Sequence, residues 1–370
     1  MQVAGYRLQG TGYRLQVSSC RGKTVRHFPS LLYFIFLTHI YMQEIQWGMI
    51  GCGNVTEKKS GAPAINKVPH SKLVAVMARK MEKAADYAQR HGVARWYDNV
   101  DDLINDPEVN AIYIATPPDV HLEYAAKAMQ AGKPVYVEKP MARNFAECEA
   151  MNRISLETGV PLFVAYYRRT LPYFVKLKEL IDEKAIGDIR CVIIALHWQP
   201  YNEETGDNAQ PRWRVFPEIS GGGHFHDLAS HQFDFLEYAL GPVKQAKGIA
   251  RNQAGLYPAD DIVVANFEFE SGIPGTGSWC YTVNKEQRID HSQLIGSKGK
   301  ISFSFFESSK IVVETPDGVV EYDVPYPPHV QQPLLETIVK ELRGEGKCPS
   351  TGETGARANL IMDWITARQL

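Results

Sequence analysis

The chain has 370 residues, which is enough for two domains of about 150 residues each. Its hydrophobic content of 44% and charged content of 22% are typical of a globular protein with a sizeable core, and they exclude a disordered chain. The net charge of -2 provides no basic field for nucleic acid or an anionic membrane, so we expect a small-molecule partner.

Residues 1–41 fit no element of the fold predicted below, and we treat them as an N-terminal extension. They contain the repeat GYRLQ at 5–9 and 12–16, and an apolar run at 31–40 that follows basic residues. This order is typical of a secretory signal, but the run is too short to span a bilayer and lacks a small-residue cleavage site. We expect Met42 to be the natural start, with a processed signal or a membrane-associating arm as the alternatives. Six widely spaced cysteines without a C-x-x-C pair favour a reducing, cytoplasmic compartment.

Residues 42–164 are predicted to form a dinucleotide-binding domain. An apolar strand begins near Glu44 and runs into glycines, and further buried strands are predicted at 73–78, 111–115 and 135–137. Helical patterns separate them at 82–90 and 122–129, and a capping box at Asn144 and Glu147 begins a helix that extends to about Ser155. Strands that alternate with helices of this length predict an α/β Rossmann domain with a doubly wound parallel sheet.

Residues 165–350 have a different pattern, dominated by alternation of apolar and polar positions. A helix near 172–182 is followed by predicted strands at 189–197 and 263–269. Pro316, Asp317 and Gly318 separate two further apolar runs, which is typical of a hairpin whose turn needs a positive φ at glycine. We therefore expect an α+β domain with a large, mostly antiparallel open sheet. Residues 351–370 are predicted to form a C-terminal helix, from about 356 to 367, that can pack back on the first domain.

Gly51, Cys52 and Gly53 directly follow the first strand and open a helix, which is the context of a dinucleotide phosphate site. Glycine allows close approach of the backbone, and the N–H groups near Asn54 and Val55 would face the pyrophosphate at the positive end of the helix. The third position of G-x-G-x-x-G is Thr56, which departs from the pattern. The alternative is a tight turn without a ligand.

The end of the second strand indicates which cofactor is preferred. An acidic residue here would bind the adenosine ribose of NAD, but the chain has Ala78 followed by Arg79 and Lys80. Two cations suit the 2′-phosphate of NADP, and hydrogen bonds to charged groups contribute about 1.5 to 3 kcal/mol each. That free energy corresponds to a binding affinity roughly one to two orders of magnitude higher for NADP than for NAD. The alternative is a solvated pair of cations on a loop.

Two motifs carry the predicted chemistry. Glu138, Lys139 and Pro140 follow a buried strand at the carboxyl edge of the sheet, where open α/β sheets bind ligands. In the second motif, GGGHFHDLASHQFD at 221–234, Asp227 and His231 fall four residues apart on one helical face.

Together, GMIGCGNV, ATPPDVHLEYAAKAMQAGKPVYVEKP and SGGGHFHDLASHQFD resemble the Gfo/Idh/MocA family of NAD(P)-dependent oxidoreductases, from about Ile45 to the C-terminus. The resemblance implies a Rossmann domain and a substrate domain whose open sheet forms homodimer or homotetramer contacts. It also implies a sugar, cyclitol or related polyol as substrate, and a catalytic set of Lys139, Asp227 and His231.

Physical chemistry assigns each of these residues a task. Oxidation of a secondary alcohol requires a base that removes the hydroxyl proton, and His231 has the most suitable side chain. Lys139 would hydrogen-bond the hydroxyl, contact the cofactor and stabilise negative charge on oxygen. Asp227 would orient the substrate or polarise the other two groups.

Further residues are predicted to line the two sites, and some have alternative interpretations. Thr116, Pro117 and His121 either line the cofactor or only cap and turn the chain. The family resemblance places Glu138 and Pro140 at the nicotinamide, and a cis bond before Pro140 is one possibility. Arg168 either binds cofactor or substrate or forms a structural ion pair. The polar loop at 198–214 is too long for a plain turn, and within it Trp213 and Arg214 are candidates for substrate binding. Tyr281 is a third candidate for the same pocket.

Three other interpretations fit parts of the sequence. The side chains of His224, His226, Asp227 and His231 suit a metal, but a metal would leave the glycine loop and Lys139 unexplained, so we expect none. A glycoside-cleaving enzyme that uses NAD transiently fits the same resemblance. A regulatory protein that senses nucleotide without turnover would need a broken catalytic set, and the three residues of this set are present.

Overall fold

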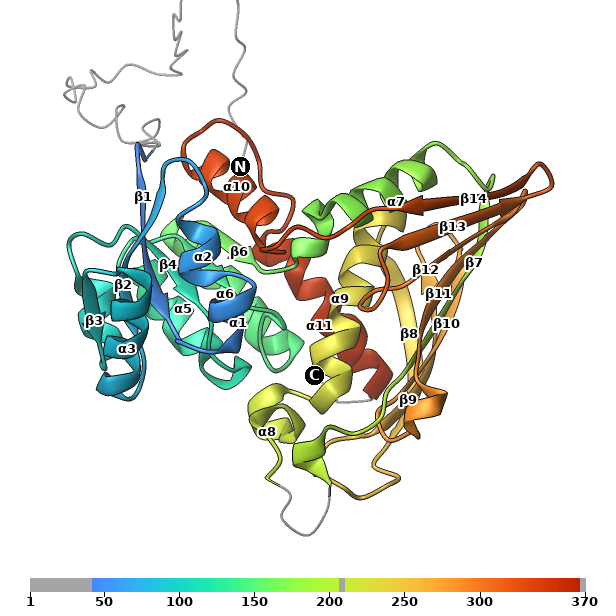
Figure 1. Ribbon diagram of the computed structural model, residues 1–370, viewed down its shortest axis with the longest axis horizontal. Coiled ribbons are helices and arrows are strands. Elements are labelled where there is room, and N and C mark those ends of the chain that lie inside the picture. The colour runs from blue at the N-terminus through green and yellow to red at the C-terminus, as the bar shows by residue number, and fades with distance from the viewer. Residues whose placement is uncertain (1–41, 206–209, 367–370) are drawn as a thin grey trace, which may run out of the picture. The chain divides into compact units, whose positions relative to one another are not determined.

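A computed structural model describes residues 42–205 and 210–366, which belong to one compact unit (Figure 1). The expectations for residues 1–41 concern a segment outside the described residues. Within the described part of the chain, no helix has the length and apolar character needed to cross a bilayer.

The first sheet is parallel and has six strands in the order β3-β2-β1-β4-β5-β6. Its strands are β1 (Ile45–Ile50), β2 (Ser71–Met77), β3 (Arg95–Tyr97), β4 (Ala111–Ile114), β5 (Val135–Val137) and β6 (Leu162–Val164). The connecting helices are α1 (Asn54–Lys58), α2 (Gly61–Ile65), α3 (Met81–His91), α4 (Val100–Asn105), α5 (His121–Gln130) and α6 (Phe145–Thr158). The predicted doubly wound sheet is confirmed, and its strand order reverses between β1 and β4, where such sheets bind ligands.

The second sheet has eight strands in the order β14-β13-β12-β11-β7-β10-β9-β8. Its strands are β7 (Ile189–His197), β8 (Val243–Arg251), β9 (Ile262–Phe269), β10 (Pro274–Cys280), β11 (Ile289–Gly296), β12 (Lys300–Phe303), β13 (Lys310–Thr315) and β14 (Gly318–Asp323). Only β7 and β10 pair in parallel, so the predicted mostly antiparallel sheet is confirmed. The predicted hairpin joins β13 to β14, and Gly318 has a φ of +135°.

Helices cover one face of this second sheet (Figure 1). They include α7 (Pro172–Asp182), α9 (Gly223–Leu240) and α11 (Gly352–Thr366), while α10 (Gln332–Leu342) lies near the first sheet. The amide of Asn359 in α11 donates to the carbonyl of Ala142 at 2.8 Å, and Asp363 accepts a hydrogen bond from the Phe145 amide at 2.7 Å. Helix α11 therefore connects both parts of the fold. It begins at Gly352, four residues before the predicted start at 356.

The helix that follows the glycine loop is short. Helix α1 ends at Lys58, and the chain turns through Lys59 and Ser60 before α2 begins at Gly61. Gly61 has a φ of +56°, and a Cβ there would lie 2.6 Å from the hydroxyl of Tyr87. Because α1 has only five residues, its dipole can contribute less to phosphate binding than that of a longer helix.

Candidate active site

The glycine loop has the backbone that a dinucleotide site requires. Gly51 has a φ of +109°, and a Cβ there would lie 2.6 Å from the carbonyl oxygen of Ala115, so only glycine fits. Nothing lies within 4 Å of a Cβ at Gly53, which leaves the outer side of the loop open. Thr56, which occupies the third motif position, accepts from the Gly53 amide at 3.0 Å and donates to the Gly53 carbonyl at 2.9 Å. The departure from the glycine pattern thus closes the loop.

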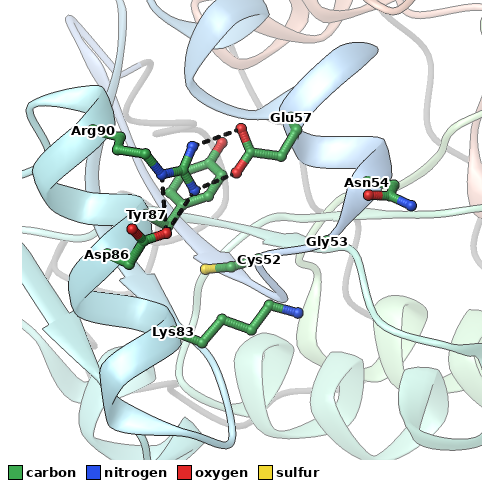
Figure 2. Close-up of a pocket in the computed structure, with 8 residues that line it drawn as sticks. All are labelled: Cys52, Gly53, Asn54, Glu57, Lys83, Asp86, Tyr87 and Arg90. Carbon is green, nitrogen blue, oxygen red and sulfur yellow. Dashed lines mark hydrogen bonds and ion pairs between the residues drawn. The ribbon is translucent and has the colours of Figure 1, made fainter.

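A cavity of about 300 Å³ adjoins this loop (Figure 2). Its lining residues come from the loop, α1 and α3, and they are Cys52, Gly53, Asn54, Glu57, Lys83, Asp86, Tyr87 and Arg90. Arg90 pairs with Glu57 and Asp86, whereas Lys83 forms no ion pair among the described residues. Burial raises the pKa of the Cys52 thiol to about 12, so this side chain stays neutral. The open glycine, the cavity and the unpaired cation fit the phosphate part of a dinucleotide.

Arg79 and Lys80 lie where the sequence predicted them, just beyond β2. The strand ends at Met77, one residue earlier than expected, and the Ala78 amide still donates to the carbonyl of Tyr97 at 3.2 Å. Both cations are exposed, and neither forms an ion pair within the described ranges. Their charges are therefore available to a ligand.

The strand β5 leads directly into the E-K-P motif. The Glu138 carboxylate accepts a hydrogen bond from the Tyr113 hydroxyl at 2.7 Å and from the Gln331 amide at 2.6 Å. The following peptide, Lys139–Pro140, is cis. Glu138 therefore anchors the end of β5 internally, and Lys139 is the residue of this motif that reaches the second domain.

The Lys139 ammonium meets Asp227 of α9. It donates to the Asp227 carboxylate at 2.6 Å and to the Asp227 carbonyl at 2.9 Å. Arg214 donates to the other carboxylate oxygen at 3.1 Å, and its guanidinium lies 4.4 Å from the centre of the Trp213 ring. Burial raises the pKa of Asp227, but the charges of Lys139 and Arg214 outweigh it and hold that pKa well below its usual range. Asp227 is thus a carboxylate that joins two cations.

His231 lies one helical turn beyond Asp227, and its side chain is 3% exposed. Its ring contacts Tyr166, Tyr167 and Phe306 at centroid distances of 6.0, 5.1 and 6.2 Å. Its Nδ1 is buried without a hydrogen-bond partner among the described residues. Burial, followed by the charges of Arg168, Lys139 and Lys59, lowers the pKa of His231 well below 6.5. The imidazole is therefore neutral and able to accept a proton.

The other predicted residues have partners of their own in the structure. His121 is fully buried between the carbonyls of Thr116 at 2.9 Å and Met141 at 3.1 Å, so it holds the loop before α5. Thr116 and Pro117 follow β4 at the carboxyl edge of the sheet. Arg168 is buried and donates to the Phe305 carbonyl at 2.9 Å. It forms no ion pair in the described part of the chain, so the alternative of a structural ion pair is not observed there, and binding of cofactor or substrate stays a prediction.

The histidines of the second motif have different neighbours, and Tyr281 lies beside His224. The Tyr281 ring lies 5.4 Å from His224, and its buried hydroxyl has no hydrogen-bond partner among residues 42–205 and 210–366. His224 binds Glu204 at 2.7 Å, and the His226 ring lies near Asp363 at 4.0 Å. Across the described ranges, no three His, Cys, Asp or Glu side chains converge as metal ligands.

Sequence reasoning missed several residues around this centre. Gln331 binds Glu138 from 193 residues away, and Glu204 binds His224 from within the polar loop. Tyr167 and Phe306 form the ring contacts of His231. The sequence hinted only at Tyr167, because it directly precedes the candidate Arg168. Gln331, Glu204 and Phe306 belong to no motif that would indicate them.

The strand order, the open glycine loop and the Lys139–Asp227 contact define a two-domain dinucleotide-binding oxidoreductase. Residues 45–166 match a family model described as an oxidoreductase family with an NAD-binding Rossmann fold, and residues 174–302 match the C-terminal domain of the same family. The chain belongs to the Gfo/Idh/MocA family, as its motifs indicated. It is an oxidoreductase with an NAD-binding Rossmann domain, and its relatives include a scyllo-inositol 2-dehydrogenase and a D-xylose dehydrogenase.

Similar proteins support this assignment. Oxidoreductase P35 of Formosa agariphila is 40% identical over 322 residues, which cover 86% of this chain and 97% of that protein. The scyllo-inositol 2-dehydrogenase (NAD(+)) of Bacillus subtilis is 26% identical over 295 residues, 78% of this chain and 82% of that one. A solved levoglucosan dehydrogenase with NADH and levoglucosan has a TM-score of 0.77 at 24% identity, covering 87% and 96% of the two chains. This last likeness concerns the fold.

Proposed function

We propose that the protein interconverts a secondary hydroxyl and a carbonyl on a sugar, cyclitol or related polyol, with NADP as the preferred cofactor. Residues 42–164 would hold the dinucleotide and residues 165–350 the substrate, with the C-terminal helix in 351–370 connecting them. The observation that carries the proposal is the hydrogen bond of 2.6 Å between Lys139 of the first domain and Asp227 of the second, next to a neutral His231.

The roles follow from the donors and acceptors present. An ammonium has three N–H groups, and Lys139 uses two of them on Asp227, so the third can bind the substrate oxygen. The neutral imidazole of His231 accepts the hydroxyl proton, while the charge of Lys139 stabilises the developing negative charge on oxygen. When bound, the dinucleotide accepts the hydrogen and electron pair released from carbon. Trp213, Arg214 and Tyr281 are proposed to contact the remaining hydroxyls.

The cofactor preference is supported by the cations around the adenosine end of the predicted site. Gly51, Gly53, Asn54 and Val55 would hold the phosphates, and Thr116, Pro117, Glu138 and Pro140 would shape the nicotinamide end. Arg79 and Lys80 are exposed and unpaired among the described residues, and Lys83 lines the cavity beside Gly53. Because Arg79 and Lys80 follow β2 where an Asp or Glu would bind the ribose of NAD, their positive charge favours a 2′-phosphate.

The proposed oligomer uses the open face of the second sheet. Branched side chains are exposed on this face along four of its strands, and they are Ile249, Val264, Ile289 and Val319. Apolar side chains grouped on one sheet face are typical of an interaction surface. We expect a homodimer or homotetramer, which light scattering of the purified protein measures.

A substrate panel tests the proposed reaction. The purified protein is mixed with NADP or NAD and a series of sugars, cyclitols and polyols, and reduction is followed at the nicotinamide absorbance band. We expect reduction with at least one polyol, and faster with NADP. No reduction with any compound would refute the proposal. Release of a leaving group without net reduction would instead indicate glycoside cleavage.

A further inference from the structure

The candidate active site holds more positive than negative charge. Lys139 and Arg214 share the carboxylate of Asp227. The nearby carboxylate of Glu138 is occupied by hydrogen bonds from Tyr113 and Gln331. Two further cations, Lys59 and Arg168, form no ion pair within the described ranges. These two cations therefore have no carboxylate partner in the described part of the chain.

Arg168 is an unusual cation because it is 5% exposed and lacks an acidic partner. Its Nε and Nη2 donate to the single carbonyl of Phe305 at 3.3 and 2.9 Å, and its Nη1 has no hydrogen-bond partner in the described structure. The guanidinium lies 4.6 Å from the Phe306 ring centre and 5.3 Å from that of Tyr167. The same two rings contact His231. A buried guanidinium with an unpaired N–H donor is energetically unfavourable unless a ligand accepts that hydrogen bond.

Lys59 approaches the same centre from the first domain. It lies in the break between α1 and α2, and its carbonyl accepts a hydrogen bond from the Gln331 amide at 3.3 Å. The side chain of Gln331 in turn binds Glu138, the neighbour of Lys139. Lys59 is exposed, so its ammonium can turn toward a ligand. The turn between α1 and α2 thus places Lys59 beside Gln331, whose side chain contacts Glu138.

The positive charges around the site also act on the phenol of Tyr167. Burial raises the pKa of Tyr167, but the charges of Arg168, Lys59 and Lys139 outweigh it, and the pKa is lowered. A fully buried phenol normally shifts in the opposite direction. A neutral polyol would leave the positive charges of Arg168 and Lys59 without a carboxylate.

Building on the proposed function, we propose that the substrate is an acidic sugar whose carboxylate is held by Arg168 and Lys59, with its reacting hydroxyl between Lys139 and His231. A planar carboxylate suits a guanidinium that has one free nitrogen. A phosphate ester would bring the same sign of charge with a larger and more strongly hydrated group. The carboxylate is thus the anion that the aromatic surroundings of Arg168 favour.

The test compares matched substrates on the full chain. Turnover with NADP is measured for glucuronate against glucose and galacturonate against galactose, with glucose 6-phosphate as a second anion. We expect kcat/KM to be at least about tenfold higher for the uronates, and lower KM to supply most of the difference. Equal values for acid and neutral sugar, or a sugar phosphate that outperforms the uronates, would overturn the inference. Turnover of neutral polyols alone would leave the proposed function standing.

Variants locate the carboxylate site. Lys59→Gln is expected to reduce the uronate-to-sugar ratio of kcat/KM severalfold, whereas Lys58→Gln, the adjacent exposed cation of α1, is the matched control and should not. Arg168→Gln should remove most of the ratio, with its melting temperature checked because the residue is buried. Binding of glucuronate, measured by calorimetry with NADP present, should weaken in the same order. If Lys59→Gln and Lys58→Gln have equal effects, the assignment of Lys59 is wrong.

Discussion

Asp227 holds two cations from different parts of the chain, so single substitutions around it have distinct consequences. Lys139→Ala removes the ammonium that is proposed to bind the substrate oxygen and that donates to Asp227, and His231→Ala removes the proposed base. Each variant is expected to lose about 10²- to 10⁴-fold in kcat, because general acid–base and electrostatic effects have this size. Affinity for NADP, measured by fluorescence titration, should change only modestly. Full activity in both variants would show that the roles are assigned wrongly.

The low pKa of His231 predicts the pH dependence of the reaction. An ordinary histidine would be half protonated near pH 6.5, but burial and three nearby cations lower the pKa of His231 well below that value. The neutral base therefore persists as the pH falls, and kcat/KM for oxidation should stay level to below pH 6.5. The same shift affects stability, because the unfolded chain gains a proton below pH 6.5 that the folded chain does not, so stability falls there. A pH–rate profile and melting temperatures measure the two effects.

Arg79 should decide between the two dinucleotides. Its side chain is exposed and unpaired in the described structure, so Arg79→Ala removes a charge without disturbing the fold. We expect kcat/KM for NADP to fall by about one to two orders of magnitude, with a much smaller loss for NAD. Lys72→Ala, at the opposite end of β2, is the matched control. Equal losses for NADP and NAD in the Arg79 variant would remove the argument from the 2′-phosphate.

Two glycines that flank α9, Gly221 before its first turn and Gly241 after its last, form a matched pair. Gly221 has a φ of +88° and Gly241 a φ of +91°, so alanine is strained at both positions. A Cβ at Gly221 would overlap the Arg143 carbonyl of the first domain, whereas nothing lies within 4 Å of one at Gly241. Gly221→Ala should therefore lower the free energy of unfolding by about 1 to 3 kcal/mol more than Gly241→Ala. Denaturant unfolding measures the difference, and equal losses would mean that this contact is unimportant.

At the scale of the whole molecule, the residues needed for the proposed reaction lie beyond residue 41. The Met42 amide donates to the Leu342 carbonyl at 3.1 Å, so the described fold begins at this residue. A chain of residues 42–370 is expected to keep the melting temperature and the kcat of the full chain. Inactivity of the shorter chain would assign residues 1–41 a part in folding or catalysis. The intact mass of the native protein tests the expected start at Met42.

The sequence alone determined features that depend on neighbours along the chain. Alternating strands and helices, the period-two pattern of β9 and the hairpin at Gly318 were read correctly, because these patterns arise within a few residues. The glycine loop also followed from local geometry at Gly51. Helix ends were less certain: α6 runs to Thr158 and α11 begins earlier than predicted, since tertiary contacts stabilise terminal turns.

Only the tertiary structure decided how the side chains of the site meet. Lys139 and Asp227 lie 88 residues apart, and Glu138 and Gln331 lie 193 apart, so no local pattern joins them. His121 turned inward to two carbonyls, and Arg168 remained without a carboxylate, because packing of both domains sets the burial and partners of each group. The motifs indicated which chemical groups belong to the site. The packing of the elements determined the charge state and the contacts of each group.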